Sequence, residues 1–187
     1  MFIQIEETPN PATLKFLPGR TILEAQTIDF PSAESARICP LAQQLFAIEG
    51  VAGIFVGADF ISVTKEAPIE WVLLKPPILQ ALVNYFVLNE KVVLERSKNN
   101  DSGNQTDSTD QEVVQEIKEL LDSKVRPAVA MDGGDIQFER FENGVVYLKM
   151  QGACSGCPSS SATLKGGIEN MLRYYIPEVT EVCEVEG

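Results

Sequence analysis

The residues with the clearest chemical potential are two cysteines, Cys154 and Cys157, separated by two residues. Small residues surround them in the segment Gly152-Ala153-Cys154-Ser155-Gly156-Cys157-Pro158. This spacing lets both sulfur atoms face one metal ion or one inorganic cluster. The same spacing suits a dithiol that cycles through a disulfide. Spacing alone therefore leaves three interpretations: a metal or cluster site, a redox dithiol, and a structural or incidental pair.

The remaining composition narrows the chemistry, because the 187 residues include no histidine and only four cysteines. Histidine metal ligands, histidine general bases, and Ser-His and Cys-His nucleophile pairs are excluded. Cys39 precedes Pro40 in an apolar stripe, so we expect a buried packing residue, and we expect the same of Cys183 in a short strand.

The pair supplies only half of a ligand set, since a structural zinc ion and a cubane cluster each need four ligands. A second copy of the chain completes the set most simply, with the two pairs near a two-fold axis. We expect such a shared site to be exposed and to release its contents readily, which suits a carrier.

The residues on either side of the cysteine pair predict the secondary-structure elements that position it. Pro158 and the three serines after it predict a helix start, which would place Cys157 near the positive end of the helix dipole. The turn signal Asn143-Gly144 predicts a hairpin before the pair. In a thioredoxin-like protein the cysteine pair would follow a strand of a βαβ unit and not a hairpin. Dithiol exchange is therefore the second candidate.

A polar run from Ser97 to Asp110 without any apolar residue divides the chain. Such a run buries nothing and is expected to be a flexible tether. We predict an α+β protein of two small mixed domains, at residues 1–96 and 111–187, joined by a linker at 97–110.

Hydrophobic periodicity predicts the elements of each domain. In the first domain we expect strands and helices at Phe2–Ile5, Leu14–Leu17, Ala36–Ile48, Val51–Val56, Phe60–Thr64 and Ile69–Leu88, the last with a kink or restart at Pro76-Pro77. In the second we expect a helix ending near Val125, a turn at Asp132-Gly133-Gly134, the hairpin, a helix at Ser159–Tyr175 and a strand at Val179–Val185. The glycines of the Asp132–Asp135 turn are expected at positive φ, with the turn packed near the cysteine loop.

Charge and termini bear on partners and location. The net charge of -12 argues against nucleic-acid binding and against an anionic membrane surface. The stretch from Trp71 to Leu88 contains a lysine and two prolines, so we expect no membrane span. The N-terminus shows neither a signal peptide nor a transit peptide, and a close cysteine pair without an export signal indicates a reducing compartment. We expect a cytoplasmic protein.

Several segments resemble a known family. Arg126–Ile136, Gly152–Ser160 and Thr163–Glu169 resemble the C-terminal domain of NifU-like (Nfu) iron–sulfur proteins. Glu7–Phe16 and Trp71–Ile78 resemble the N-terminal Nfu domain that often accompanies it. The two-domain combination covers nearly the whole chain outside the linker.

The resemblance implies that Cys154 and Cys157 of two protomers hold a [4Fe–4S] cluster in a homodimer. It implies that the protein is a carrier and no enzyme, which takes the cluster from upstream assembly machinery and passes it to client apo-iron–sulfur proteins. Client thiolates would replace carrier thiolates one at a time. Met150 and Met171 are expected to contribute to a dimer or client surface.

The chain begins directly at the N-terminal domain, so we expect a bacterial cytoplasm, with a processed mitochondrial matrix protein as the second location. Two other functions remain open: a dithiol–disulfide oxidoreductase using the same pair, and a zinc-bridged interaction module.

Overall fold

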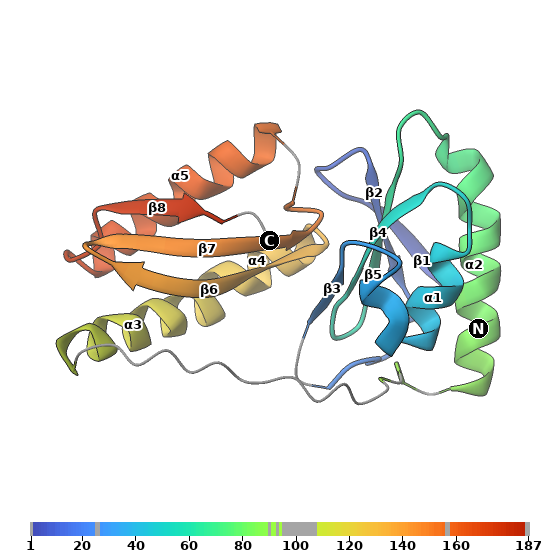
Figure 1. Ribbon diagram of the computed structural model, residues 1–187, viewed down its shortest axis with the longest axis horizontal. Helices are drawn as coiled ribbons and strands as arrows, with labels where there is room; N and C mark the ends of the chain where they lie inside the picture. Colours follow the sequence, from blue (N-terminus) through green and yellow to red (C-terminus); the bar gives the residue numbers. More distant parts are fainter. Residues whose placement is uncertain are drawn as a thin grey trace. The chain divides into compact units, whose positions relative to one another are not determined.

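The computed structural model describes residues 2–24, 27–89, 91–92, 94, 108–155 and 158–185, with the backbone alone at 108–111 and 158–161. The chain divides into two compact units, Met1–Lys98 and Asn99–Gly187. Each unit combines helices with its own sheet, as Figure 1 shows. The predicted α+β class, with two mixed domains, is confirmed.

Unit 1 is built on an antiparallel five-stranded sheet in the order β1-β2-β5-β4-β3. Its strands are β1 (Gln4–Glu7), β2 (Thr13–Leu17), β3 (Ile28–Phe30), β4 (Val51–Val56) and β5 (Ile61–Lys65). Its helices are the 3₁₀ helix η1 (Ser35–Ile38), α1 (Pro40–Phe46) and α2 (Trp71–Leu88). Figure 1 shows α1 and α2 together on one side of this sheet.

Two features of unit 1 differ from the expected elements. The single helix predicted over Ala36–Ile48 is split, because Cys39 is extended (φ −133°, ψ 104°) before Pro40. A residue before proline is pushed out of the helical region by the proline ring, and Pro40 then opens α1. The short strand β3 was not predicted, since three residues carry too little periodicity.

Helix α2 runs without a break through Pro76 and Pro77, where a kink or restart was expected. A proline leaves the carbonyl four residues earlier without its helical partner. The affected carbonyls belong to Val72 and Leu73, residues that are 75% and 69% exposed. Water can therefore reach this turn of the helix and replace the missing bonds.

By length and composition alone α2 would be able to cross a membrane, with a mean hydropathy of 1.4. Its inward side chains nevertheless form part of the core of unit 1: Leu74, Ile78, Leu82, Tyr85 and Phe86. A core helix of a globular unit meets the same criterion, so the composition is weak evidence for a span.

Unit 2 has a three-stranded sheet in the order β6-β7-β8, with β6 and β7 antiparallel and β8 parallel to β7. Its strands are β6 (Gly134–Glu142), β7 (Val145–Gly152) and β8 (Glu181–Glu184), and its helices are α3 (Ser108–Leu120), the π-helical turn η2 (Leu121–Val125), α4 (Arg126–Met131) and α5 (Pro158–Tyr175). The predicted order of helix, hairpin, helix and strand is confirmed. The first helix, however, continues past Val125 into α4.

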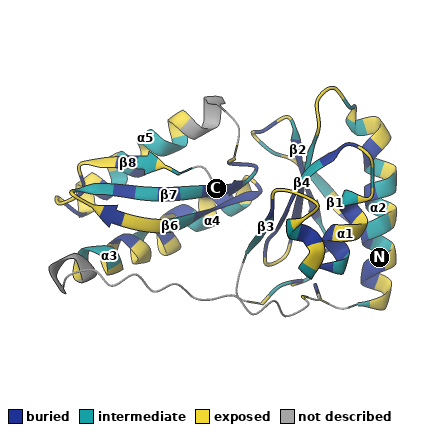
Figure 2. Ribbon diagram, viewed as in Figure 1, coloured by how far each residue is buried: buried dark blue, intermediate teal, exposed yellow. Residues whose placement is uncertain are grey.

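Alternation along β7 turns Val146, Leu148 and Met150 into the core of unit 2, where they meet the inward faces of the helices. Figure 2 shows the buried positions of this sheet in dark blue. Met150 is only 5% exposed, so its predicted place on a dimer or client surface is wrong. Met171 is half-buried and packs against the same core.

Candidate functional site

The cysteine loop, residues 153–157, joins the end of β7 to the start of α5. Within it the structure describes Ala153, Cys154 and Ser155, whereas Gly156 and Cys157 lie outside the described residues. The predicted hairpin before the loop and the predicted helix after it are both present. Of the two predicted ligands, the structure therefore places Cys154.

Cys154 is buried, with 6% of its surface exposed, and it belongs to the hydrophobic core of unit 2. We expected the site to be exposed, and for this thiol in this structure that expectation is wrong. The neighbouring residue Ala153 is also buried, at 3% exposure, while Ser155 is exposed. Ala153 and Cys154 therefore face the interior of unit 2, whereas Ser155 faces solvent.

Gly134, the first residue of β6, provides the space that the thiol occupies. A Cβ atom built on Gly134 would lie 2.6 Å from the Sγ atom of Cys154 and 2.6 Å from the carbonyl oxygen of Gln151. Real Cβ atoms do not approach other atoms this closely, so only glycine fits without movement of the loop. Cys154 therefore depends on Gly134 for its buried position.

The turn before β6 is hydrogen-bonded to the loop. The backbone N–H of Ala153 donates to the carbonyl of Gly133 at 3.2 Å. The predicted packing of the Asp132–Asp135 turn near the cysteine loop is thus confirmed. Only Gly133 has a positive φ, of 81°, so the expectation of positive φ for both glycines is wrong for Gly134.

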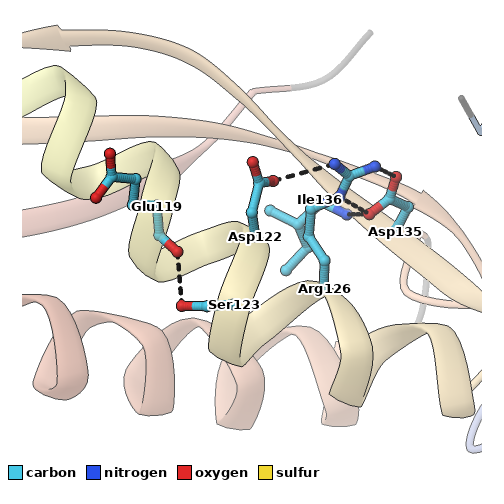
Figure 3. Close-up of polar contacts among 6 residues, drawn as sticks. All are labelled: Glu119, Asp122, Ser123, Arg126, Asp135 and Ile136. Carbon is cyan, nitrogen blue, oxygen red and sulfur yellow. Dashed lines mark hydrogen bonds and ion pairs between the residues drawn. The ribbon is translucent and has the colours of Figure 1, made fainter. Parts of the chain in front are cut away.

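Arg126 and Asp135 form a two-pronged ion pair beside this turn, drawn in Figure 3. The Nε and Nη2 atoms of Arg126 donate to the two carboxylate oxygens of Asp135, each at 2.8 Å. The Asp135 side chain is 3% exposed, and its Oδ1 atom also accepts the backbone N–H of Ile136 at 2.8 Å. The hydrogen bonds to Asp135 raise the pKa of Arg126 above its ordinary range, against the opposing effect of burial.

Sequence reasoning missed this pair as part of the site. Asp135 entered only as the end of a turn, and Arg126 only as part of a segment that resembles a family. No local pattern links residues nine positions apart when a helix and a turn separate them. The one weak signal in the sequence is an arginine at the start of the segment that ends in the turn Gly133-Gly134-Asp135.

The other cysteines lie where packing residues were expected. Cys39 is fully buried in the core of unit 1. Cys183 is half-buried in β8, with its Sγ atom 3.6 Å from a carboxylate oxygen of Glu181. Among the residues that the structure describes, no group of three or more histidine, cysteine, aspartate or glutamate side chains is arranged to hold a metal ion.

Two hollows on the described surface lie away from the cysteine loop. One, of about 270 Å³, is lined by Pro40, Gln44, Asn84, Tyr85, Leu88 and Asn89. The other, of about 350 Å³, is lined by Glu116, Glu119, Leu120, Ser123, Tyr175 and Ile176. Neither brings a cysteine next to a basic group, so neither adds a nucleophile to the site.

Comparison with known proteins finds a matching family model in each of the two units. A family model described as "NifU-like domain" matches residues 117–183, and one described as "Scaffold protein Nfu/NifU N terminal" matches residues 3–90. The human protein named "NFU1 iron-sulfur cluster scaffold homolog, mitochondrial" is 50% identical over 99% of this chain and 72% of its own length. The protein of the same name from Drosophila persimilis is 50% identical over 99% of this chain and 65% of its own length.

A solution structure of a NifU-like protein from Saccharomyces cerevisiae is 28% identical, covering 50% of this chain and 84% of its own, with a TM-score of 0.46. Since both family models match in order, and since half of the residues are identical to those of a relative of which the chain spans more than two thirds, the chain belongs to the Nfu family of NifU-like proteins.

Proposed function

We propose that this protein is an iron–sulfur cluster scaffold and carrier, not an enzyme. Two protomers would hold one [4Fe–4S] cluster through Cys154 and Cys157 of each. The observation that carries the proposal is the cysteine pair itself, in a family whose relatives are named iron–sulfur cluster scaffolds. The cluster is cargo in this proposal, received from an assembly machinery and given to client apoproteins.

The donor set suits such a cargo. A [4Fe–4S] cluster takes one thiolate per iron, and two chains with two loop cysteines each supply four. The absence of histidine leaves thiolates as the soft ligands of this chain. Because Cys154 is buried in the core of unit 2, the loop would have to open before this thiol is shared between protomers.

Transfer would need no catalytic base. A client thiolate would bond to a cluster iron as the bond to a carrier thiolate breaks, and four such exchanges would move the intact cluster. The carrier thiolates would be released as anions and take up protons from water, with no change in oxidation state. This ligand exchange agrees with a site that contributes cysteines and no general base.

The proposed location follows the names of the relatives. Both carry the word "mitochondrial", which supports the mitochondrial matrix, the second location from the sequence. The same names give no support to the bacterial cytoplasm, which was the first expectation. We keep the expectations of no nucleic-acid and no membrane partner as part of the proposal, on the basis of the charge of -12.

Anaerobic reconstitution with iron and sulfide tests the proposal. We expect a brown protein with about four irons per dimer, and a shift from monomer to dimer on loading. Cys154→Ser and Cys157→Ser should each abolish the colour, whereas the matched controls Cys39→Ser and Cys183→Ser should retain it. A colourless protein with a reversible Cys154–Cys157 disulfide would instead establish the oxidoreductase alternative. Stoichiometric zinc in the purified protein would establish the zinc-bridged module.

A further inference from the structure

We propose that Arg126 and Asp135 are positioning residues for Cys154: their ion pair holds the start of β6, against which the thiol rests. The biological role of this positioning rests on the proposed function, in which Cys154 would be a ligand of the cluster. The arrangement itself is independent of that function.

The ion pair joins two successive elements, α4 and β6, across the short turn between them. Arg126 is the first residue of α4, and Asp135 is the second residue of β6. A third contact runs from Nη1 of Arg126 to Oδ1 of Asp122 in η2, at 3.0 Å. Figure 3 shows the guanidinium group between the two aspartates. A planar fork of this kind fixes direction as well as distance, which an ammonium group does not.

From the ion pair, contacts lead directly to the thiol. Asp135 directly follows Gly134 in the chain. Because Gly134 has no side chain, it leaves the space that Sγ of Cys154 occupies. On the other side, the turn is tied to the end of α4 by the bond from the Gly133 N–H to the Ala130 carbonyl, at 3.1 Å. The carbonyl of Gly133 then accepts the N–H of Ala153. The turn is therefore held at both ends, and the cysteine loop is bonded to its middle.

Burial makes the pair sensitive to change. Asp135 is almost fully enclosed, so removing the guanidinium of Arg126 takes the ion pair away from a buried carboxylate, which is strongly destabilising in protein interiors. Asp122 is 64% exposed, and its contact is of the kind that contributes little. Loss of the Asp135 contact should loosen the turn, and with it the surface that shelters Cys154. Loss of the Asp122 contact should not.

Thiol reactivity in the metal-free chain of 187 residues tests the proposal. The rate of alkylation by iodoacetamide is measured for each cysteine by mass spectrometry of fragments. We expect Asp135→Asn and Arg126→Lys to raise the rate at Cys154 by about tenfold, because local opening exposes the thiol. Asp122→Asn is the matched control and should change that rate by less than about twofold.

Cys183 separates local loosening from general unfolding, because it lies in the same unit, on β8. In the supporting result only Cys154 becomes more reactive. An unchanged rate at Cys154, or a parallel rise at Cys183, would overturn the proposal. Should Asp135→Asn prevent folding, the double variant Arg126→Met with Asp135→Leu removes both charges together. The same selective rise at Cys154 is then expected, and its absence would count against positioning by the ion pair.

Measuring alkylation also distinguishes a failure of this inference from a failure of the proposed function. No iron is present during alkylation, so a wild-type chain that fails to bind a cluster would refute the proposed function and leave the thiol comparison valid. Conversely, a chain that binds a cluster but shows no selective change at Cys154 would refute only the role of Arg126 and Asp135.

Discussion

The backbone N–H of Thr180 donates a hydrogen bond of 2.7 Å to the carbonyl oxygen of Gly144, and this bond ties the tip of the β6–β7 hairpin to the segment that enters β8. The hydroxyl of Thr180 donates to the same oxygen at 3.1 Å. Gly144 has a φ of 82°, and a Cβ atom there would lie 2.8 Å from Oγ1 of Thr180. The turn thus requires glycine for its backbone and for the space beside it.

Gly144→Ala should destabilise unit 2 by about 1–3 kcal/mol, since it combines backbone strain with a steric overlap. For a domain of this size, each 1 kcal/mol corresponds to a fall in Tm of roughly 4–8 °C. Gly19→Ala is the control, because Gly19 has a similar φ of 75° but no atom of the described residues lies within 4 Å of the added Cβ. Equal losses of stability for the two variants would show that the contact with Thr180 contributes nothing.

Gly134→Ala should displace the cysteine loop, because the added methyl group overlaps Sγ of Cys154. We expect a loss of about 1–3 kcal/mol in the free energy of unfolding of unit 2, together with faster alkylation of Cys154. Thermal unfolding and fragment mass spectrometry measure the two effects.

The control for this change is Gly167→Ala, in the interior of α5, where nothing in the part of the chain that the structure describes lies within 4 Å of the added Cβ. Alanine there should stabilise the helix by roughly 0.5–1 kcal/mol. Wild-type stability and wild-type thiol reactivity in Gly134→Ala would be inconsistent with the described packing.

The stability of unit 1 should depend on pH through Cys39. Burial raises the pKa of this thiol above its ordinary value of 9.0, although backbone N–H groups at the start of α1 oppose the shift. At alkaline pH the unfolded chain loses this proton while the folded chain keeps it, so the unfolded state binds fewer protons. The free energy of unfolding therefore falls as pH rises above 9.0 toward the raised value.

Urea unfolding of the wild type and of Cys39→Ala between neutral and alkaline pH measures this effect. The variant loses packing at every pH, but it lacks the alkaline loss, so the difference between the two proteins should shrink as pH rises. Cys183→Ala, in the other unit, is the control and should leave the pH dependence of unit 1 unchanged. Parallel curves for wild type and Cys39→Ala would contradict the prediction.

Much of unit 2 was predictable because its signals are local. Asn143 and Gly144 adopt φ values of 50° and 82°, as a two-residue hairpin turn requires, and those dihedral angles depend on the residues themselves. Pro158 opens α5 as predicted, since the lack of an N–H suits the first turn of a helix. The type of metal ligand was also predictable from the sequence, because the composition excludes histidine and contains one close cysteine pair.

The sequence by itself thus determined most of the elements, their order in unit 2 and the chemical type of the candidate site. Only the tertiary structure decided that Cys154 is buried, that Met150 faces the core and that Arg126 reaches Asp135. The physical reason is distance along the chain. Turns and helix starts depend on neighbouring residues, whereas burial and ion pairing depend on groups that folding brings together, and no periodicity records which groups those are.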